Sequence, residues 1–443
     1  MPAASSRPAR RHLWLRKRPR VMPRPFAAPR AWSVKVAVIA DDLTGAADSG
    51  VQLVRAGYRT AVAFRGSPVP PADDLDAVAV DTDSRAMSAA SAAKLVVEAG
   101  HSMRGARVVF KKVDSTLRGP MAAELLAALE ATGREVAVFC PAFPDAGRTV
   151  SDGVLLVNGV PVHETGFRDD PVTPVLESHL PTLLSAVCPT LATLSTEDLG
   201  NAGTVQSVLV NSNCVVADAG TDAELEALVR AVPDPASVLW VGSAGLVRAF
   251  GVVHAGPRAA EPNETPGSTS RVVVVVGSLN SVARKQLEVL LREAYMTPVA
   301  LNAAALLDDP SKGAMKGAIA GARSALLDGH GVVVYSTADR GSEKMAKAEA
   351  ARRVAEALAE VVTGLSKEDV FDALVLTGGD TAVRVAQRLG ATGVLLQGEI
   401  EPGVPVGTLI GPKPYRVVTK AGGFGDAGTL LKAVQMLLKG GKD

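Results

Sequence analysis

The chain has few of the residues that mark several common functional classes. Its three cysteines, Cys140, Cys188 and Cys214, lie far apart among 443 residues, which gives no metal-site spacing and fits a reducing cytoplasm. Aromatic residues make up only 4% and the net charge is +1, which argues against a surface for nucleic acid. No apolar run reaches the roughly 20 residues of a membrane span. We therefore expect a cytoplasmic protein with neither nucleic-acid nor membrane partners.

The first 33 residues contain no acidic side chain, and the first carboxylates are Asp41 and Asp42. This segment is rich in Arg and Pro, cannot bury a core and is expected to be a disordered basic extension. It has no apolar centre of the kind that a secretory signal requires, and its prolines would break the helix of a transit peptide. We favour a start codon assigned too far upstream, with Met22 as one alternative start.

From residue 34 onward, short runs rich in Val and Ala alternate with helical patterns. Such alternation indicates parallel α/β units whose strands are covered on both faces. A polar stretch rich in Pro, Gly and Thr, residues 254–270, is the best linker candidate. The sequence therefore predicts an α/β protein of two domains with mainly parallel sheets, residues 34–253 and 271–443. Residues 147–162 are the exception and predict a β-hairpin in the first domain, with Asn158-Gly159 at its turn.

The predicted elements follow from runs of apolar residues and from helical periodicity. Strands are expected at 35–40, 77–81, 107–111, 135–140, 214–218, 237–241, 271–276, 331–335, 373–376 and 415–419. Helices are expected at 50–56, 89–99, 121–131, 222–231, 282–291, 345–361, 382–389 and 430–438.

Three predicted strands of the second domain run into turns suited to an anion. The turns are Gly277 to Ser281, Thr377 to Thr381 and Lys420 to Gly428. Glycine lets the backbone approach an anion, and free N–H groups at a helix start point at it. Such turns gather at the carboxyl edge of a parallel sheet, so three of them together suggest a nucleotide site. Any one alone is explained by ordinary helix capping, and neither GxxxxGK[ST] nor a first-turn GxGxxG is present.

Asp426 lies within the last of these turns, where a base for phosphoryl transfer would stand beside glycine N–H groups. The arrangement is similar, by analogy only, to the Gly-Ala-Gly-Asp turn of ribokinase-type sugar kinases. An equally weighted alternative is that Asp426 caps the last helix. Asp380 could contact Mg²⁺ or a ribose, but we favour capping of its helix.

Asp41 and Asp42 follow the first strand of the first domain. Adjacent carboxylates repel each other unless cations or hydroxyl groups use them, so they could accept hydrogen bonds from a polyol or bind a metal. One of them could instead cap the next helix, which leaves the other unexplained.

The ends of the next two strands add Asp83 and Asp114 together with the cations Arg85, Lys112 and Arg118. Arginine can grip a carboxylate or phosphate through two hydrogen bonds. Hydroxyl acceptors beside anion-binding cations suit a small polyhydroxy acid. A further loop at this edge, residues 141–149, contributes Arg148. Lys111 is expected to be solvated.

Six of these segments occur in the order found in a known family. They are Asp41 to Ala46, Asp81 to Arg85, Lys112 to Gly119, Pro141 to Pro144 with Gly147 to Thr149, Thr377 to Thr381, and Lys420 to Asp426. Together they resemble the four-carbon acid sugar kinase family. The resemblance runs from about Val34 to the C-terminus and excludes only the basic extension.

The resemblance implies ATP-dependent phosphorylation of the terminal hydroxyl of D-threonate, D-erythronate or a 3-oxo-tetronate. It implies that the first domain holds the acid and the second holds ATP with Mg²⁺, whose protein ligands stay open. The implied nucleotide contacts are Ser278 or Ser281, Gly378, Gly379, Asp380, Thr381, Gly422, Gly423 and Gly425. Leu279-Asn280 departs from the small or Cys residue expected after the Gly-Ser pair.

On this basis we expect Arg85, Lys112 or Arg118 to bind the substrate carboxylate and Asp41 and Asp42 to bind its hydroxyls. The full set of expected substrate contacts also includes Asp83, Asp114 and Arg148. Closure of the domains would bring the hydroxyl in line with the γ-phosphate. Asp426 is the first candidate for the base and Asp42 the second.

Two alternatives stay open. Asp81-x-Asp83 at a strand end is the nucleophile pattern of haloacid-dehalogenase-like phosphatases, although a later acidic metal motif is missing and the second domain would be unexplained. A sensor of nucleotide or sugar acid would bind without turnover. A homodimer is expected only because dimers are common.

Overall fold

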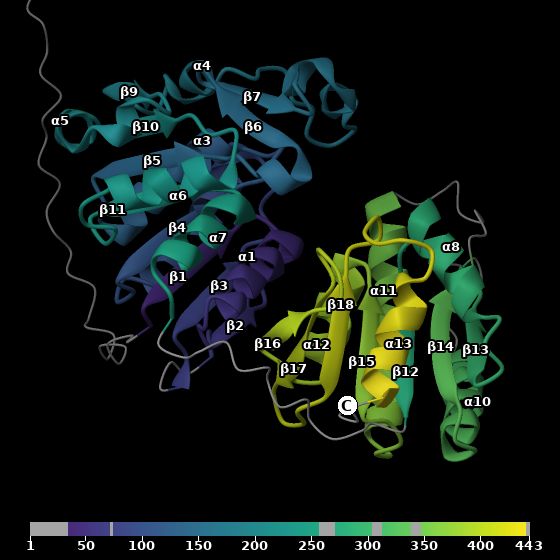
Figure 1. Cartoon of the computed structure of the whole chain (residues 1–443). Coiled ribbons are helices and arrows are strands. Elements are labelled where there is room, and N and C mark those ends of the chain that lie inside the picture. The colour runs from purple at the N-terminus through teal and green to yellow at the C-terminus, as the bar shows by residue number, and fades with distance from the viewer. Residues whose placement is uncertain (1–33, 71–73, 257–270, 304–311, 338–346, 440–443) are drawn as a thin grey trace, which may run out of the picture.

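The computed structural model describes residues 34–70, 74–256, 271–303, 312–337 and 347–439. The predicted basic extension lies outside the described residues, as does the predicted linker from residue 257 onward. The described chain forms two α/β halves, shown in purple to teal and in green to yellow in Figure 1.

The first half is built on parallel strands that are buried on both faces, as their continuous apolar sequences predict. Its strands are β1 Val36–Ala40, β2 Thr60–Ala63, β3 Ala77–Asp81, β4 Val108–Lys112, β5 Val136–Cys140, β9 Leu191–Leu194, β10 Cys214–Ala217 and β11 Val238–Gly242. Its helices are α1 Leu43–Arg55, α2 Ala89–Ser102, α3 Met121–Thr132, α4 Leu180–Leu184, α5 Ala202–Asn211, α6 Asp222–Ala231 and α7 Ala244–Val253.

The second half repeats this plan with a different strand order. Its strands are β12 Val272–Val276, β13 Met296–Leu301, β14 Gly331–Ser336, β15 Ala373–Thr377, β16 Gly393–Glu399, β17 Pro405–Ile410 and β18 Arg416–Lys420. Its helices are α8 Ser281–Leu290, α10 Lys312–Leu327, α11 Lys347–Ser366, α12 Gly379–Arg388 and α13 Thr429–Lys439. Alternate valines of β12 join two apolar clusters, one with α8 and α13 and the other with α10 and α11, as expected for a strand covered on both faces.

One continuous sheet joins the two halves. Its order is β13-β14-β12-β15-β18-β17-β16-β2-β3-β1-β4-β11-β5-β10-β9. The junction is the antiparallel pairing of β2 with β16, in which Val62 lies opposite Val394. An ion pair of 2.7 Å between Arg55 and Glu399 crosses the same junction.

The segment of the first half that was predicted to be a β-hairpin, residues 147–162, has a different structure. Residues 148–161 form a three-stranded antiparallel sheet, β6 Arg148–Ser151, β7 Val154–Val157 and β8 Val160–Pro161. Asn158-Gly159 makes the second turn, as predicted, but Asp152-Gly153 makes an earlier one. Both residues of each turn have positive φ, which is the backbone that Asn-Gly and Asp-Gly favour in two-residue hairpins.

Several predicted boundaries were wrong. The helix predicted from residue 50 begins at Leu43, because Asp42 caps it by accepting a hydrogen bond of 2.8 Å from the Gly45 N–H. Strands β2, β9, β13, β16 and β17 were not predicted at all. Interruptions such as Pro298 in β13 and Gly398 in β16 hid the strand pattern.

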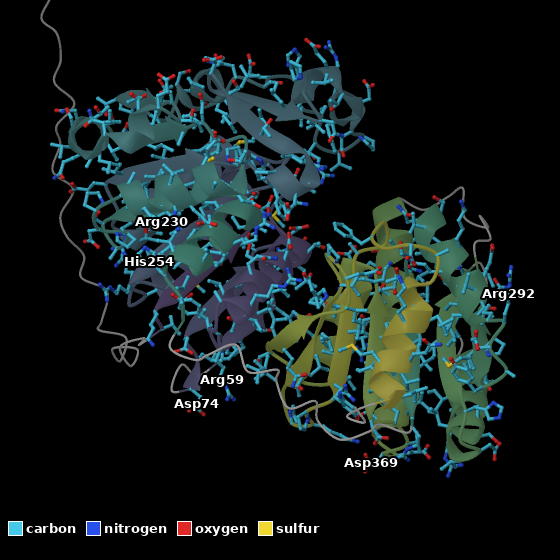
Figure 2. The ribbon with its side chains drawn as sticks, viewed as in Figure 1. Arg59, Asp74, Arg230, His254, Arg292 and Asp369 are labelled. Atoms are coloured by element: carbon cyan, nitrogen blue, oxygen red, sulfur yellow. The ribbon has the colours of Figure 1, made fainter. Side chains whose placement is uncertain are left out.

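Charged side chains cover the outer surface of both halves, and Arg230, Arg292 and Asp369 are exposed examples (Figure 2). Among the described residues, no helix combines the length and the apolar character that crossing a membrane requires.

The junction predicts an effect for Gly393→Ala. A Cβ at Gly393 would stand 2.2 Å from the backbone oxygen of Val62, so β2 and β16 must move apart. We expect the substitution to lower the free energy of unfolding by about 1–3 kcal/mol, measured by urea denaturation. The control is Gly321→Ala on α10, where the added methyl meets open space and a helical alanine is favoured. Equal stability of Gly393→Ala and the wild type would contradict the role of this pairing.

Candidate active site

The three glycine-containing turns of the second half meet at one edge of the sheet. They follow β12, β15 and β18, which are neighbours in the order β12-β15-β18 and run parallel. A Cβ at Gly422 would stand 2.0 Å from Ser278 Oγ, and one at Gly277 would stand 2.0 Å from Thr381 Oγ1. Backbone packing this close requires glycine, so the three turns form a single cradle.

The α12 helix begins in this cradle without a capping side chain. Its N-cap is Gly378, with φ of 99° and no side-chain cap, and a Cβ at Gly379 would meet open space. The expectation that Asp380 caps this helix was wrong, since Asp380 lies within the first turn. The missing side chains of Gly378 and Gly379 leave room for an anion, and the N–H groups at the start of α12 can donate hydrogen bonds to it.

Of the two serines considered for the nucleotide, only Ser278 contacts the glycine cradle. Its Oγ accepts a hydrogen bond of 3.2 Å from the Asn280 N–H. Asn280 in turn caps α8, accepting 2.9 Å from Val282 N–H. Ser281 is the first residue of α8 and is exposed.

A residue that the sequence did not reveal fixes the third turn. The Gln286 amide, fully buried on α8, donates to the carbonyl oxygens of Phe424 at 2.9 Å and Asp426 at 2.7 Å. These bonds hold the backbone of the glycine turn against a helix that lies far from it in sequence. Only the tertiary fold brings the two together, so no local signal could have found Gln286.

The Asp426 carboxylate lies on the protein surface. Its Oδ1 accepts 2.8 Å from Gly428 N–H, and its Oδ2 pairs with Lys432 Nζ at 2.7 Å. The hydrogen bonds from Lys432 and Gly428 lower the pKa of Asp426. The carboxylate thus braces the turn before α13, which begins at Thr429.

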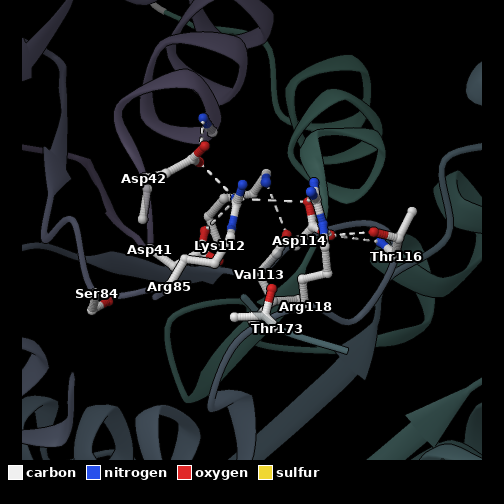
Figure 3. Close-up of polar contacts among 12 residues, drawn as sticks. Asp41, Asp42, Ser84, Arg85, Lys112, Val113, Asp114, Thr116, Arg118 and Thr173 are labelled. Carbon is white, nitrogen blue, oxygen red and sulfur yellow. Dashed lines mark hydrogen bonds and ion pairs between the residues drawn. The ribbon is translucent and has the colours of Figure 1, made fainter. Parts of the chain in front are cut away.

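The polar residues of the first half gather around Arg85, as Figure 3 shows. Its guanidinium forms hydrogen bonds of 2.8 and 3.0 Å with the two oxygens of Asp41 and one of 2.7 Å with Asp42. Asp114 lies 3.7 Å away on another side. Three carboxylates therefore surround Arg85, and two of them bind its Nε and Nη2 groups.

The pKa values of the two adjacent aspartates, Asp41 and Asp42, are shifted in opposite directions. Burial raises the pKa of Asp42, although the Arg85 guanidinium opposes the shift. The pKa of Asp41 is lowered, because the attraction of Arg85 together with Lys111 and Lys112 overcomes the effect of burial. Only Asp42 lines the cleft described below.

Arg118 is also engaged by carboxylates. It makes two hydrogen bonds to Asp114, at 2.9 and 3.1 Å, and lies 3.6 Å from Asp170. Its guanidinium stands 5.6 Å from the centre of the Phe167 ring, a cation–π distance. The loop after β8 thereby covers Arg118. Despite burial, Arg85 and Arg118 hold the pKa of Asp114 well below its usual range.

Lys112 is the cation of this cluster with the fewest partners. It is 5% exposed and donates 2.8 Å to the Val113 carbonyl oxygen. In the described part of the chain, no carboxylate oxygen lies within 4.0 Å of its Nζ. Its ammonium group therefore keeps donors for another acceptor.

Lys111 was expected to be solvated, and this was wrong. Its side chain is fully buried and pairs with Glu124 at 3.0 Å, while Ser84 donates to the other Glu124 oxygen. Successive residues of a strand point to opposite faces of the sheet, so Lys111 faces α3 while Lys112 faces the polar edge.

Arg148 and Asp83 do not join the Arg85 cluster. Arg148 turns back and donates to the Ala146 carbonyl oxygen. Asp83 pairs with Arg65 at 3.0 Å at the protein surface. Its N–H donates 2.8 Å to Asp81, whose buried carboxyl has its pKa raised to about 8, mainly by burial.

A cleft of about 680 Å³ lies between the two halves. Asp42, Thr44, Arg65, Asp81 and Asp83 line it from the first half, and Gly379, Asp380 and Arg384 line it from the second. Among the residues that the structure describes, no group of three His, Cys, Asp or Glu side chains is arranged to hold a metal ion. The lining residues thus place carboxylates of the first half, which can accept hydrogen bonds from hydroxyl groups, opposite the start of α12 in the second half.

Comparisons with known proteins agree with this division. The protein-family model described as a sugar-binding N-terminal domain matches residues 36–250. The family model described as a nucleotide-binding C-terminal domain matches residues 273–430. The crystal structure of a Haemophilus influenzae protein has a TM-score of 0.74 at 24% identity, covering 91% of this chain and all of that one. This likeness concerns the fold alone.

Three relatives of nearly equal length are kinases. The D-threonate kinase of Bordetella bronchiseptica is 39% identical, covering 91% of this chain and 97% of its own. The D-threonate kinase of Salmonella typhimurium is 34% identical, covering 90% and 98%. The D-erythronate kinase of Heliobacterium modesticaldum is 30% identical, covering 91% and 97%. The chain therefore belongs to the four-carbon acid sugar kinase family.

Proposed function

We propose that this protein is an ATP-dependent kinase that phosphorylates the terminal hydroxyl of a four-carbon sugar acid, with D-threonate as the first candidate. The observation that carries the proposal is the cleft. In it, Asp42 of the sugar-binding half and the first turn of α12 of the nucleotide-binding half line the same space. D-threonate comes first because relatives of that specificity reach 39% and 34% identity, whereas a 3-oxo-tetronate kinase reaches 31%.

Lys112 is proposed to bind the substrate carboxylate. Arg85 and Arg118 were equal candidates on sequence grounds, but each already forms ion pairs with at least two carboxylates. Their role is to hold Asp41, Asp42 and Asp114 in place. Arg85 already binds both oxygens of Asp41 and one oxygen of Asp42. The second oxygen of Asp42 would then accept a hydrogen bond from a substrate hydroxyl, as carboxylates commonly do.

The glycine cradle is proposed to hold the phosphates of ATP. Its fit to phosphate rests on the missing Cβ atoms of Gly378 and Gly422, the Ser278 hydroxyl and the uncapped start of α12. ATP supplies the phosphoryl group, and Mg²⁺ neutralises the phosphate charge in such reactions. Asp380 is the carboxylate at the α12 start that could reach this ion.

Asp42 is proposed as the base for the substrate hydroxyl. Its raised pKa makes it a stronger base than an ordinary aspartate, and it lines the cleft. Asp426 has a lowered pKa and an ion pair with Lys432. These environments reverse the order that the sequence suggested, and Asp426 is proposed instead to keep the glycine turn in shape.

The phosphatase alternative is not favoured. A nucleophilic aspartate must be ionised, whereas burial raises the pKa of Asp81 to about 8 and so opposes the ionised form. All three kinase relatives match the chain over both halves. A kinase function therefore explains the second half, which a phosphatase function would leave unexplained. A homodimer and a cytoplasmic location stay predictions.

A panel of acids tests the function directly. With ATP and Mg²⁺, release of ADP is measured on D- and L-threonate, D- and L-erythronate, 3-oxo-tetronates, glycerate and ribonate. We expect turnover confined to one four-carbon acid, with D-threonate first. Release of phosphate from phosphorylated acids without ATP would instead favour the phosphatase. Nucleotide binding with no turnover on any acid would favour a sensor.

Lys112→Met tests the carboxylate contact. A hydrogen bond to a charged group contributes about 1.5–3 kcal/mol, so KM for the acid should rise about 10- to 100-fold while KM for ATP changes little. Lys94→Met, at an exposed position of α2, is the matched control. An unchanged KM for the acid in Lys112→Met would assign the carboxylate to another residue.

Asp42→Asn and Asp426→Asn separate the two candidate bases. Asparagine also caps helices, so Asp42→Asn should keep α1 intact while kcat falls about 10²- to 10⁴-fold. Asp426→Asn should lower kcat less than about tenfold, in keeping with a supporting role. The wild-type kcat should rise with pH through a pKa above the ordinary 3.8, because the base must lose its proton. A larger loss in Asp426→Asn would restore Asp426 as the base.

A further inference from the structure

Lys420, the last residue of β18, is a buried cation that pairs with no carboxylate of the described residues. Its side chain is 3% exposed, and its Nζ donates to the carbonyl oxygens of Ala421 at 2.9 Å and Gly422 at 3.5 Å. In the described ranges of the chain, no carboxylate oxygen lies within 4.0 Å of this ammonium group. The substrate and nucleotide contacts proposed above do not use it.

Burying an ammonium group against carbonyl oxygens alone is costly. Burial lowers the pKa of Lys420 to about 8, and the more distant Glu401 only partly offsets this. An apolar residue of similar size would fill the space without that cost. The position therefore favours a cation that meets an anion which the described residues do not supply.

The place of Lys420 indicates which anion this is. Its carbonyl oxygen accepts 2.9 Å from the Gly378 N–H, and its chain continues into Gly422, so it lies between two turns of the glycine cradle. A small cavity of about 20 Å³ is lined by Lys420 and Gly379 from the second half and by Leu43 and Thr44 from the first. The ammonium group thus stands where the nucleotide-binding half faces the sugar-binding half.

We infer that Lys420 contacts the terminal phosphoryl group of ATP as it passes from the nucleotide-binding half to the substrate. The inference rests on the proposed function and adds to it a group that neutralises charge in the transition state. During transfer, the bond from the γ-phosphorus to the oxygen bridging to the β-phosphate breaks and ADP leaves with that electron pair. The substrate oxygen bonds to the phosphorus, and its proton passes to Asp42. Lys420 keeps its protons throughout.

A purely structural role makes a different prediction. If Lys420 only shaped the turn through the carbonyl oxygens of Ala421 and Gly422, its loss would disturb every phosphate held by the cradle. ATP and ADP would then lose affinity equally. Contact with the terminal phosphoryl group instead predicts a loss for ATP alone, because ADP lacks that group.

The test is the affinity of the full chain for ATP and for ADP, measured by calorimetry without sugar acid. The variants are Lys420→Met, Lys420→Arg and the control Lys285→Met, an exposed position of α8. In Lys420→Met we expect ATP affinity to fall at least tenfold while ADP affinity stays within twofold, and kcat with the acid to fall by about 10² or more. Lys420→Arg should retain part of the ATP affinity and part of kcat, and Lys285→Met should match the wild type in both.

The melting temperature shows whether Lys420→Met folds. At pH 7 it should equal or exceed that of the wild type, because the substitution removes an unpaired buried charge. An equal loss of ATP and ADP affinity, or no loss of either, would overturn the inference while leaving the kinase proposal intact. If the wild type bound neither nucleotide, the kinase proposal would fail and the role of Lys420 with it.

Discussion

The antiparallel pairing of β2 with β16 is the constraint on which the arrangement of the site depends. Since β17 and β18 continue antiparallel from β16, the parallel strands of the two halves have opposite polarity across the junction. In a flat sheet their carboxyl edges would point away from each other. The usual twist of about 20–25° per strand, accumulated over the strands between β1 and β18, would turn these edges toward one another. Asp42 and Gly379 consequently line one cleft.

The described charged residues of the first half mainly bind one another and do not form a strongly positive site for anions. Arg85 and Arg118 are buried among Asp41, Asp42, Asp114 and Asp170, so their positive charge is largely neutralised. An acidic substrate approaching this edge meets several fixed acceptors and one ammonium group that is still available. Such a surface favours a ligand with many hydroxyls and one carboxylate over a ligand with many negative charges.

The sequence predicted those features that depend on neighbouring residues. Buried strands such as β1 and β12 are short apolar runs, and the polar residues that follow them are local as well, so both were found. The convergence of the three glycine turns followed from the rule for parallel sheets, and the contact of Gly422 with Ser278 confirms it. That Lys112, and neither arginine, keeps available donors could not be predicted, because Asp41 and Asp42 reach Arg85 from another strand end and Asp170 reaches Arg118 from another loop. Gln286 and Lys111 were missed for the same reason, since burial and long-range pairing give them their roles.

The shared sheet also affects what each half can do alone. Val62 and Val394 pair although they lie in opposite parts of the sequence, so the junction can form only after both strands have been made and positioned. Until then β2 and β16 are edge strands, with rows of unpaired backbone groups that can pair with another molecule. Each half therefore acts as the cover of the other's sheet edge. Either half produced separately would expose that edge, and its solubility would depend on something else covering it.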